Sequence, residues 1–542
     1  MVDAWVAARS SQITATDAPA EAPADRGPRG PKPRAWPWLA GLVLAGTALR
    51  VPRLAVGYWG DEALTVGIAR HPLASIPGLL RFDGSPPLYY WLLHAWIAAF
   101  GTSEAATHSL SLFLAAACVP TGWWCGRALA GTGAGWAAAS LLAFSPYLTT
   151  YGTETRMYSL LALEAIVALG CFARLLIAGG RRALAGAVVS SAAVVYTHNW
   201  GLYLVAAMVG VGAVVAGRER QPLVAAYAAA IGLAYLPWLP SLLHQVGHTG
   251  APWSPRPTLG QLVNDPLRVS AWAWWPALAA AVLVAVAMRF VEHPGARAVP
   301  GGRALALPFS GAVCATTVAA GWTGAQLVRS WSPRYLGVAV VPALGVLGAA
   351  LVRTAAGRAA VVGVCAVFVV ANVASLTVPA DRLLYSKSNA AWSVADLAAS
   401  LQPGDLVVSA QVSQLPLVTY YAGRQRGVTF ATPLGAVSDP SVVDWDDLPT
   451  RLARGRPSVE LAPLIARVPA GGRVLLVAPL AWGRPAPGDS YGATVTTQGQ
   501  AAVRAVLGDQ RLVLLATRVG PPGARPAAPV VAWLMFKPAA GR

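Results

Sequence analysis

The sequence predicts a mainly α-helical, polytopic membrane protein, with about 11–13 transmembrane helices, followed by an extracytoplasmic α/β domain. Of its 542 residues, 56% are hydrophobic and only 12% are charged, about half the charged fraction of an ordinary soluble chain. Apolar runs near 20 residues recur between positions 38 and 377, and each is long enough to cross a bilayer. After position 380, acidic residues become frequent and the apolar runs shorten to strand length.

The expected elements can be taken in chain order. Residues 1–35, rich in Ala, Pro and charge, should be a disordered cytoplasmic N-terminus, because basic residues flank the first span on that side. Residues 36–379 should form the transmembrane domain, with a first span over 38–56. Further apolar segments are expected near 105–125, 133–151, 157–179, 183–199, 200–217, 222–246, 269–290, 305–328, 334–352 and 357–377.

The segment 86–101 is apolar but short for a full crossing. If it crossed fully, the arginines of the later loops would fall outside the membrane. We therefore expect it to be shallow or re-entrant, unless a short crossing is overlooked elsewhere. This choice keeps the N-terminus and the arginine-rich loops in the cytoplasm and places the C-terminal region outside the plasma membrane.

The C-terminal domain is expected over residues 380–542. Strands are predicted near 406–410, 473–478, 511–517 and 530–536, and helices near 392–401 and 415–421. The sequence contains no phosphate-binding P-loop and none of the motifs GxGxxG, HExxH or GxSxG in this region.

The charge and the cysteines exclude several classes of protein. The formal net charge is +18, but the basic residues lie mostly in loops between apolar runs, as topology signals and lipid contacts do. A nucleic-acid-binding surface would need a basic patch with base-reading partners, and the sequence has none. All five cysteines fall in apolar spans without a CxxC pair, so neither a disulfide framework nor a zinc site is indicated.

An acidic pair, Asp61 and Glu62, follows the first span. Only nine carboxylates occur between Trp36 and Pro379, and an acidic pair at the mouth of a membrane helix is costly to desolvate. Two interpretations are open. The pair is either catalytic at the outer membrane face or a solvated turn between two helices.

A second group of polar residues lies in the segment SPYLTTYGTETRMYSL, residues 145–160. It contains Tyr151, Glu154, Arg156 and Tyr158. The glutamate and the arginine either pair with each other or bind an anion and hydroxyl groups, because the guanidinium fork matches a phosphate.

Three further motifs carry candidate binding residues. His198 and Asn199 interrupt an apolar run in YTHNWGLY, where a satisfied helix-end histidine is the simpler interpretation. Arg334 and Tyr335 lie in WSPRYLG, where the arginine either snorkels to the lipid surface or binds a lipid phosphate. Tyr89 belongs to DGSPPLYY, whose tyrosines suit an interfacial belt. Together, carboxylates, arginines and aromatic rings at one membrane face suit transfer of a sugar from a lipid phosphate to a hydroxyl.

These motifs resemble those of the GT-C glycosyltransferases, in particular glycosyltransferase family 39-like bacterial membrane proteins, and the plan is similar to that of protein O-mannosyltransferases and the aminoarabinose transferase. The resemblance covers roughly residues 38–377. It rests on GDEALT at 60–65, PPLYYWLLHAW from 86, SPYLTTYGTETRMYSL at 145–160, YTHNWG at 196–201 and SPRYL at 332–336.

The resemblance implies a polyprenyl-phosphate-linked sugar as donor. Mannose or a related hexose or pentose would be moved with inversion to an extracytoplasmic protein, lipid or glycan. The resemblance also implies that Asp61 is the general base, with Glu62 beside it. Arg156 and Arg334 would bind the donor phosphate, and neither a cofactor nor a metal is expected. The predicted donor-binding set is Arg156, Arg334, Glu154, Tyr158, Tyr89, Tyr151, His198, Asn199 and Tyr335.

Two other functions remain open. A transporter or flippase of lipid-linked glycans would use the same arginines without a base, and internal symmetry between interrupted spans would favour it. The sequence shows no such symmetry. A non-catalytic protein that binds envelope components through its C-terminal domain is the third interpretation, and the position of Asp61 and Glu62 favours an enzyme over both.

Overall fold

The computed structural model describes residues 35–276, 278–280, 283, 306–423, 426–483 and 489–539. Residues 1–38 and 39–542 form two separate units, and the account below concerns the second. Residues 1–34 of the predicted N-terminal segment lie outside the described residues. Most of the second half of the predicted span 269–290 also lies outside them.

Helices carry the chain up to residue 384. Alanine, leucine and valine dominate them, and tight turns such as the one at Gly131, whose φ is +95°, separate consecutive helices because glycine tolerates positive φ. The elements are α2 (Trp36–Ala48), η1 (Val51–Arg53), α3 (Gly60–Ala69), α4 (Ile76–Asp83), α5 (Leu88–Phe100), α6 (Glu104–Ala130), α7 (Thr132–Phe144), α8 (Pro146–Tyr151), α9 (Tyr158–Ala178), α10 (Arg181–Thr197), α11 (Gly201–Val215), α12 (Gln221–Tyr235), α13 (Leu239–His248), α14 (Leu259–Ala271), η2 (Trp272–Trp274), α16 (Ala306–Leu327), η3 (Pro333–Leu336), α17 (Gly337–Leu351), α18 (Ala355–Ala374) and α19 (Ala380–Leu384).

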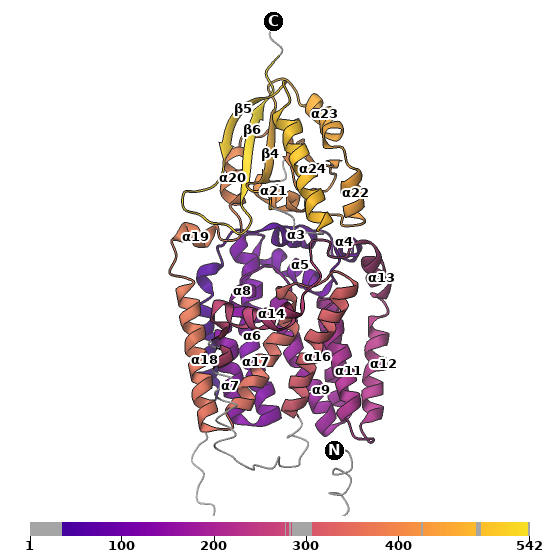
Figure 1. Cartoon of the computed structure of the whole chain (residues 1–542), viewed down its shortest axis with the longest axis vertical. Helices are drawn as coiled ribbons and strands as arrows, with labels where there is room; N and C mark the ends of the chain where they lie inside the picture. The colour runs from indigo at the N-terminus through magenta and orange to yellow at the C-terminus, as the bar shows by residue number, and fades with distance from the viewer. Residues whose placement is uncertain are drawn as a thin grey trace, which may run out of the picture. The chain divides into compact units, whose positions relative to one another are not determined.

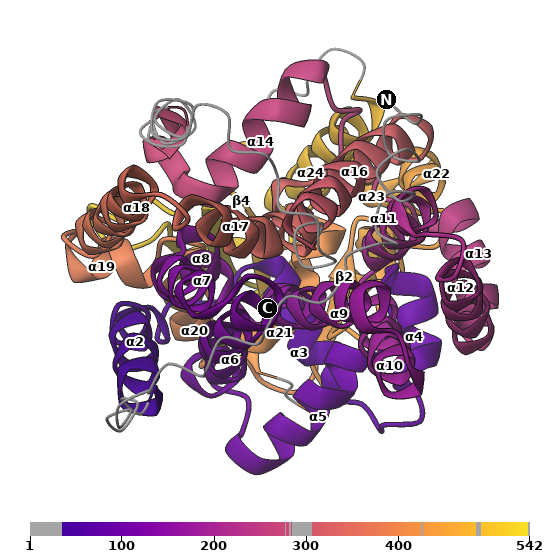
Figure 2. The ribbon, with the colours of Figure 1, turned by 90° about the horizontal axis from the view of Figure 1, so that it is seen from below.

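Several of these helices are long and apolar enough to span a membrane. Among the described residues four qualify alone, namely Glu104–Ala130, Tyr158–Ala178, Pro333–Leu351 and Ala355–Ala374. The pair α12 and α13, bent by 72°, qualifies as a fifth when taken together. Seen from below, α9 lies near the middle of the bundle and α18 at its edge (Figure 2). The chain is thus a multi-pass helical membrane protein, while the number of 11–13 crossings stays a prediction.

The short segment after the acidic pair is helix α5. Its 13 residues span about 20 Å, less than the roughly 30 Å of a bilayer core. It packs against α3 and α6. Whether this segment crosses the membrane stays a prediction.

The C-terminal region is a six-stranded sheet covered by helices (Figure 1). The strand order is β3-β2-β1-β4-β6-β5. Strands β2, β1 and β4 are parallel, whereas β3, β6 and β5 pair antiparallel. The elements are α20 (Ala390–Ala398), β1 (Leu406–Ser409), η4 (Val412–Gln414), α21 (Leu415–Ala422), β2 (Thr429–Thr432), β3 (Gly435–Ala436), α22 (Leu448–Arg454), α23 (Pro457–Arg467), β4 (Arg473–Pro479), α24 (Ser490–Leu507), β5 (Val513–Arg518) and β6 (Val530–Phe536).

The four predicted strands and the two predicted helices of this region are present as β1, β4, β5, β6, α20 and α21. Strands β2 and β3 are missing from the prediction. β3 has only two residues. β2 is as long as β1, but its sequence TFAT has threonines at both ends, whereas β1 begins with the apolar run LVV. Helix α24 was also missed. Its sequence SYGATVTTQGQAAVRAVL is rich in glycine and threonine, which weaken the helical signal.

Helix α3 connects the two parts of this unit. Its residues Ala63 and Val66 share a buried cluster with Val394 and Val418 of the C-terminal region. Gly67 lies so close to that region that a Cβ atom there would come within 1.9 Å of the Ser441 carbonyl oxygen. The absence of a side chain at Gly67 therefore sets how closely the C-terminal region approaches α3.

We expect Gly67→Ala to lower the free energy of unfolding by about 1–3 kcal/mol, the usual cost of overpacking. The reason is the clash with the Ser441 backbone. Gly78→Ala is the matched control, because Gly78 is also helical and has nothing within 4 Å of its Cβ position. Thermal unfolding in detergent should show a lower midpoint for Gly67→Ala alone, and equal midpoints would contradict the contact.

Candidate active site

The acidic pair begins helix α3, where the positive end of the helix dipole favours carboxylates. Successive helical residues differ by about 100° in direction, so the two side chains diverge. The side chain of Asp61 is 32% exposed, and its Oδ2 lies 2.7 Å from Arg334 Nη1. Glu62 is fully buried. The two carboxylates therefore occupy different environments and cannot share one role.

A cavity of about 400 Å³ opens beside Asp61. Its polar wall comes from α3, α4, the α8–α9 loop, the α10–α11 loop and η3, which are distant in the sequence. Five of the predicted residues line it, namely Asp61, Arg156, His198, Asn199 and Tyr335. Leu202, Leu327 and Val328, from α11 and the end of α16, supply an apolar side. The cavity thus combines charged groups with a surface suited to a lipid or a sugar face.

Two guanidinium groups face the Asp61 carboxylate and its backbone. Arg334 also donates from Nε to Ser332 Oγ at 3.1 Å and lies 5.0 Å from the centre of the Trp59 ring. Arg156 donates from Nη1 to Thr65 Oγ1 at 2.6 Å and to the Asp61 carbonyl at 3.3 Å. The Nε of Arg156 has no hydrogen-bond partner among the described residues. Arg156 therefore retains a buried donor that no described residue uses.

His198 is a neutral group in the cavity wall. Burial, and then the nearby charges of Arg156 and Arg334, lower the pKa of its imidazole to about 3. Its Nδ1 accepts the backbone N–H of Trp200 at 3.1 Å, so the ring hydrogen is on Nε2. A neutral His198 can donate that hydrogen to a bound oxygen without adding charge.

The predicted aromatic residues form a layer behind the arginines. The ring centres of His198 and Tyr335 are 4.7 Å apart, those of Tyr158 and Tyr335 are 6.2 Å apart, and those of Tyr151 and Tyr158 are 5.2 Å apart. The guanidinium of Arg156 lies 5.8 Å from the Tyr158 ring centre. Tyr151 and Tyr158 do not belong to the described lining of the cavity, so they reach its contents only through their neighbours.

Tyr89 and Glu154 also lie behind the cavity wall. Tyr89 is buried, with its hydroxyl 3.4 Å from Ser111 Oγ. Glu154 is buried, and its Oε2 has no hydrogen-bond partner among the described residues. Burial raises the pKa of Glu154 despite the nearby charges of Lys387 and Arg334. Their predicted roles as direct binding residues stay predictions, and their positions favour indirect ones.

One carboxylate oxygen of Glu62 accepts three hydrogen bonds. Its Oε1 accepts from His108 Nε2 at 2.7 Å, from Thr155 N at 2.8 Å and from Lys387 Nζ at 2.8 Å. Burial acts to raise the pKa of Glu62, but the charges of Lys387 and His108 outweigh it, so the pKa is lowered. A catalytic role for Glu62 stays a prediction, and these contacts favour a positioning role.

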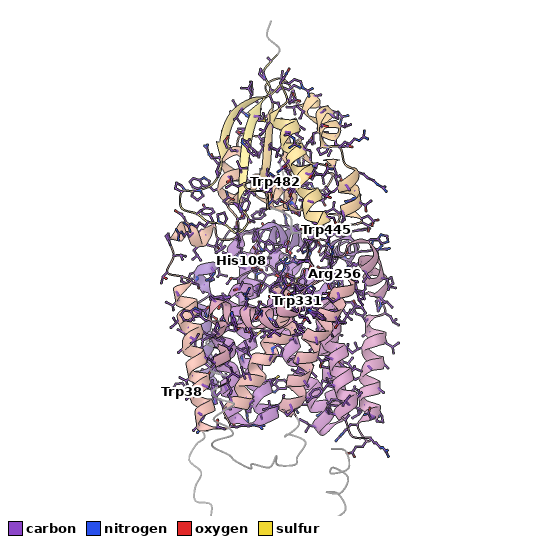
Figure 3. The ribbon with its side chains drawn as sticks, in the orientation of Figure 1. Trp38, His108, Arg256, Trp331, Trp445 and Trp482 are labelled. Carbon is purple, nitrogen blue, oxygen red and sulfur yellow. The ribbon has the colours of Figure 1, made fainter. Side chains whose placement is uncertain are left out.

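Sequence reasoning missed several residues of the site. Asp83, at the end of α4, lines the cavity and accepts from the Tyr90 hydroxyl at 3.3 Å. Its position in DGSPPLYY was the available signal. Trp445 of the C-terminal region also lines the cavity, with its ring centre 4.7 Å from that of Trp253. Figure 3 shows Trp445 where the sheet-bearing region meets the helices, above His108 and Trp331. No local pattern in the sequence indicates this contact.

Metal ligation has no candidate in the described part of the chain. There, no three His, Cys, Asp or Glu side chains lie together in a way that could hold a metal ion. The expected independence from metals and cofactors stays a prediction.

Comparison with solved structures finds proteins of similar fold. A structure of ArnT from Cupriavidus metallidurans bound to undecaprenyl phosphate aligns with a TM-score of 0.57 and 15% identity, over 92% of this chain and 98% of ArnT. The same protein in the apo state aligns over the same shares with a TM-score of 0.55 and 15% identity.

Another similar structure is the arabinofuranosyltransferase AftD from Mycobacteria, with a TM-score of 0.49, 17% identity and coverage of 93% of this chain and 42% of AftD. No protein-family model matches the sequence, and comparison with curated proteins finds no match. The likeness to ArnT establishes the fold, and the function has to be argued from the site.

Glu154→Gln tests the buried carboxyl. A raised pKa means that the folded state loses stability as the pH rises from the ordinary value near 4.3 to the folded-state pKa, because the carboxyl ionises in the unfolded chain while the buried group stays protonated. The substituted amide cannot ionise, so this variant should unfold at a higher temperature than the unaltered protein at pH 8, by on the order of 1 kcal/mol in stability. Near pH 4 the difference should vanish. A variant less stable at pH 8 would show that the ionised carboxylate is favoured.

Proposed function

We propose that the protein is a membrane glycosyltransferase that moves a sugar from a polyprenyl-phosphate donor to a hydroxyl group of an extracytoplasmic acceptor, with inversion at the anomeric carbon. The observation that carries this proposal is the meeting of Asp61 with two guanidinium groups. Arg334 pairs with the Asp61 carboxylate, and Arg156, which lines the same cavity as Asp61, donates to the Asp61 backbone carbonyl. The GT-C fold, shared with an ArnT structure that holds undecaprenyl phosphate, supports the choice of a lipid phosphate.

Asp61 is the general base of this proposal. Its carboxylate is partly exposed to the cavity, whereas Glu62 is buried away from it. Asp61 takes the proton of the acceptor hydroxyl while that oxygen bonds to the anomeric carbon, and the bond from this carbon to the phosphate oxygen breaks. The products are a new glycoside and polyprenyl phosphate. One base in one displacement gives inversion.

The arginines stabilise the leaving phosphate. Charge accumulates on the phosphate oxygens as the bond breaks, and guanidinium groups placed there stabilise it most strongly in a site shielded from water. In the described structure Arg334 is paired with Asp61, so a bound phosphate would share this guanidinium. The unpartnered Nε of Arg156 and the Nε2–H of His198 supply further donors.

The proposal also covers the sugar, the acceptor, the orientation in the membrane and the independence from metals and cofactors. The sugar is mannose or a related hexose or pentose, and the cavity of about 400 Å³ falls in the range of small-ligand sites. The acceptor is a protein, lipid or glycan of the cell envelope. Residues 36–379 form the catalytic transmembrane domain in the plasma membrane, with the N-terminus cytoplasmic and residues 380–542 outside. Neither a metal nor a cofactor takes part.

The decisive experiment is sugar transfer in proteoliposomes with polyprenyl-phosphate mannose and related donors. The unaltered protein should release polyprenyl phosphate, and Asp61→Asn should reduce kcat by about 10²–10⁴-fold, the contribution of a positioned base. Donor binding should persist in this variant, because the arginines remain.

Equal activity of the two proteins would contradict the assignment of Asp61 as the base. No turnover of any donor by the unaltered protein, together with movement of lipid-linked sugar between leaflets, would replace the enzyme with a transporter. Titration with a chelator during the same assay checks the proposed independence from metals.

Arg334→Gln should raise the KM for the donor and lower kcat, by about 10²-fold or more in kcat/KM, because a charge-assisted contact to the phosphate is lost. Arg353→Gln is the matched control, since Arg353 is exposed at the start of the loop before α18. Binding of polyprenyl phosphate measured by fluorescence or calorimetry should weaken only for Arg334→Gln. Equal affinities of both variants would remove Arg334 from the donor site.

A further inference from the structure

Lys387 reaches the helical part of the protein from the C-terminal region. Its backbone is fixed there, because its carbonyl accepts the N–H of Ala528 at 2.9 Å and the neighbouring Ser386 carbonyl accepts that of Ala527 at 2.8 Å. The side chain extends toward α3, where Nζ lies 2.8 Å from Glu62 Oε1 and 3.1 Å from the Thr153 carbonyl. One lysine therefore joins the C-terminal region to two segments of the candidate site.

The Glu62 carboxylate depends on such partners. Glu62 and His108 are 0% exposed and the Lys387 side chain 17% exposed, and a buried carboxylate that loses a charged partner is strongly destabilised. The second ring nitrogen of His108 lies 2.8 Å from the Leu54 carbonyl. A carbonyl only accepts, so this Nδ1 carries a hydrogen, and a second hydrogen is shared between Nε2 and Glu62. The lysine thus completes a set of donors around one oxygen.

The same oxygen fixes two segments that carry the proposed chemistry. Glu62 adjoins Asp61 on α3, and Thr155, whose N–H donates to Glu62 Oε1, adjoins Arg156. Arg156 in turn donates to Thr65 and to the Asp61 carbonyl. A shift of Glu62 would therefore displace the base and a phosphate-binding guanidinium relative to each other.

We propose that Lys387 is a positioning residue of the transfer reaction, which holds the start of α3 and the loop of residues 152–157 in their relative places through Glu62. The proposal rests on the proposed function. It gives the C-terminal region a part in catalysis, since the region supplies the charge that keeps the acidic pair and the arginine aligned. Glu62 is then a structural anion, and Asp61 alone acts on the acceptor.

The test compares variants of the full-length protein in proteoliposomes. Lys387→Met should lower kcat by about 100-fold, the effect of a displacement near 1 Å, with a smaller change in the donor KM, because Arg334 keeps its hydrogen bond to Ser332. Lys387→Arg, which keeps the charge, should retain most of the activity. Lys537→Met is the matched control, because Lys537 donates only to the carbonyls of Ile465, Ala466 and Val468 in the described structure, and its kcat should equal that of the unaltered protein.

The double variant Glu62→Gln with Lys387→Met separates positioning from chemistry. It removes the buried carboxylate together with its lysine partner, so its kcat should exceed that of Lys387→Met alone. If Glu62→Gln and the double variant are both as inactive as Asp61→Asn, Glu62 takes part in the chemistry and the proposal is overturned.

A second measurement does not need activity. Hydrogen exchange of the peptide that contains residues 152–157 should be faster in Lys387→Met than in the unaltered protein or in Lys537→Met, because the Thr155 N–H loses its fixed acceptor. Unchanged exchange together with unchanged kcat would overturn the proposal. If the unaltered protein transfers no sugar, the proposed function fails, while the exchange rate still decides whether Lys387 holds this loop.

Discussion

The architecture of the site depends on one buried carboxylate oxygen. Oε1 of Glu62 accepts hydrogen bonds from α6, from the loop before α9 and from the C-terminal region, while its own helix, α3, carries Asp61 into the cavity. A buried anion tolerates little displacement of its partners, because each lost donor leaves charge without compensation in a medium of low dielectric constant. Four segments far apart in sequence are thereby held at one point, and the cavity forms beside it.

This arrangement accounts for the two faces of α3. One face presents Asp61 and Leu64 to the cavity, and the other presents Ala63, Val66 and Gly67 to the C-terminal region. The helix has only ten residues and would be marginal alone. Contacts on both faces stabilise it, so the position of Asp61 reflects packing around the whole helix as well as the hydrogen bonds at its start.

The sequence predicted the class of fold and part of the candidate site. Hydropathy predicted the helical membrane part, because apolar length is a strong local signal, and shortened apolar runs located four strands. The scarcity of carboxylates singled out Asp61, which does line the cavity together with Arg156, His198, Asn199 and Tyr335. These residues are distinctive because polar groups are rare in an apolar chain.

The long-range contacts of the site and the burial of its residues could not be predicted from short stretches of sequence. Nothing near Lys387 or Trp445 in the sequence reveals that each contacts a segment hundreds of residues earlier, since such pairing is decided by the packing of the C-terminal region on α3. The different environments of Asp61 and Glu62 were likewise hidden, because adjacency in sequence says nothing about burial. Tyr89 and Glu154 show the converse, since suitable residue types within the right motifs ended behind the cavity wall.

The divergence of the acidic pair has a consequence for chain length. Because each helical residue turns the side chain by about 100°, the site depends on where the helix begins as well as on the identity of the two acids. A single residue gained or lost between Trp59 and Asp61 would leave both carboxylates in the sequence, yet would rotate a different residue toward Arg334 and another into the buried centre. The spacing from the first turn of α3 is thus as much a determinant of the site as the acids themselves.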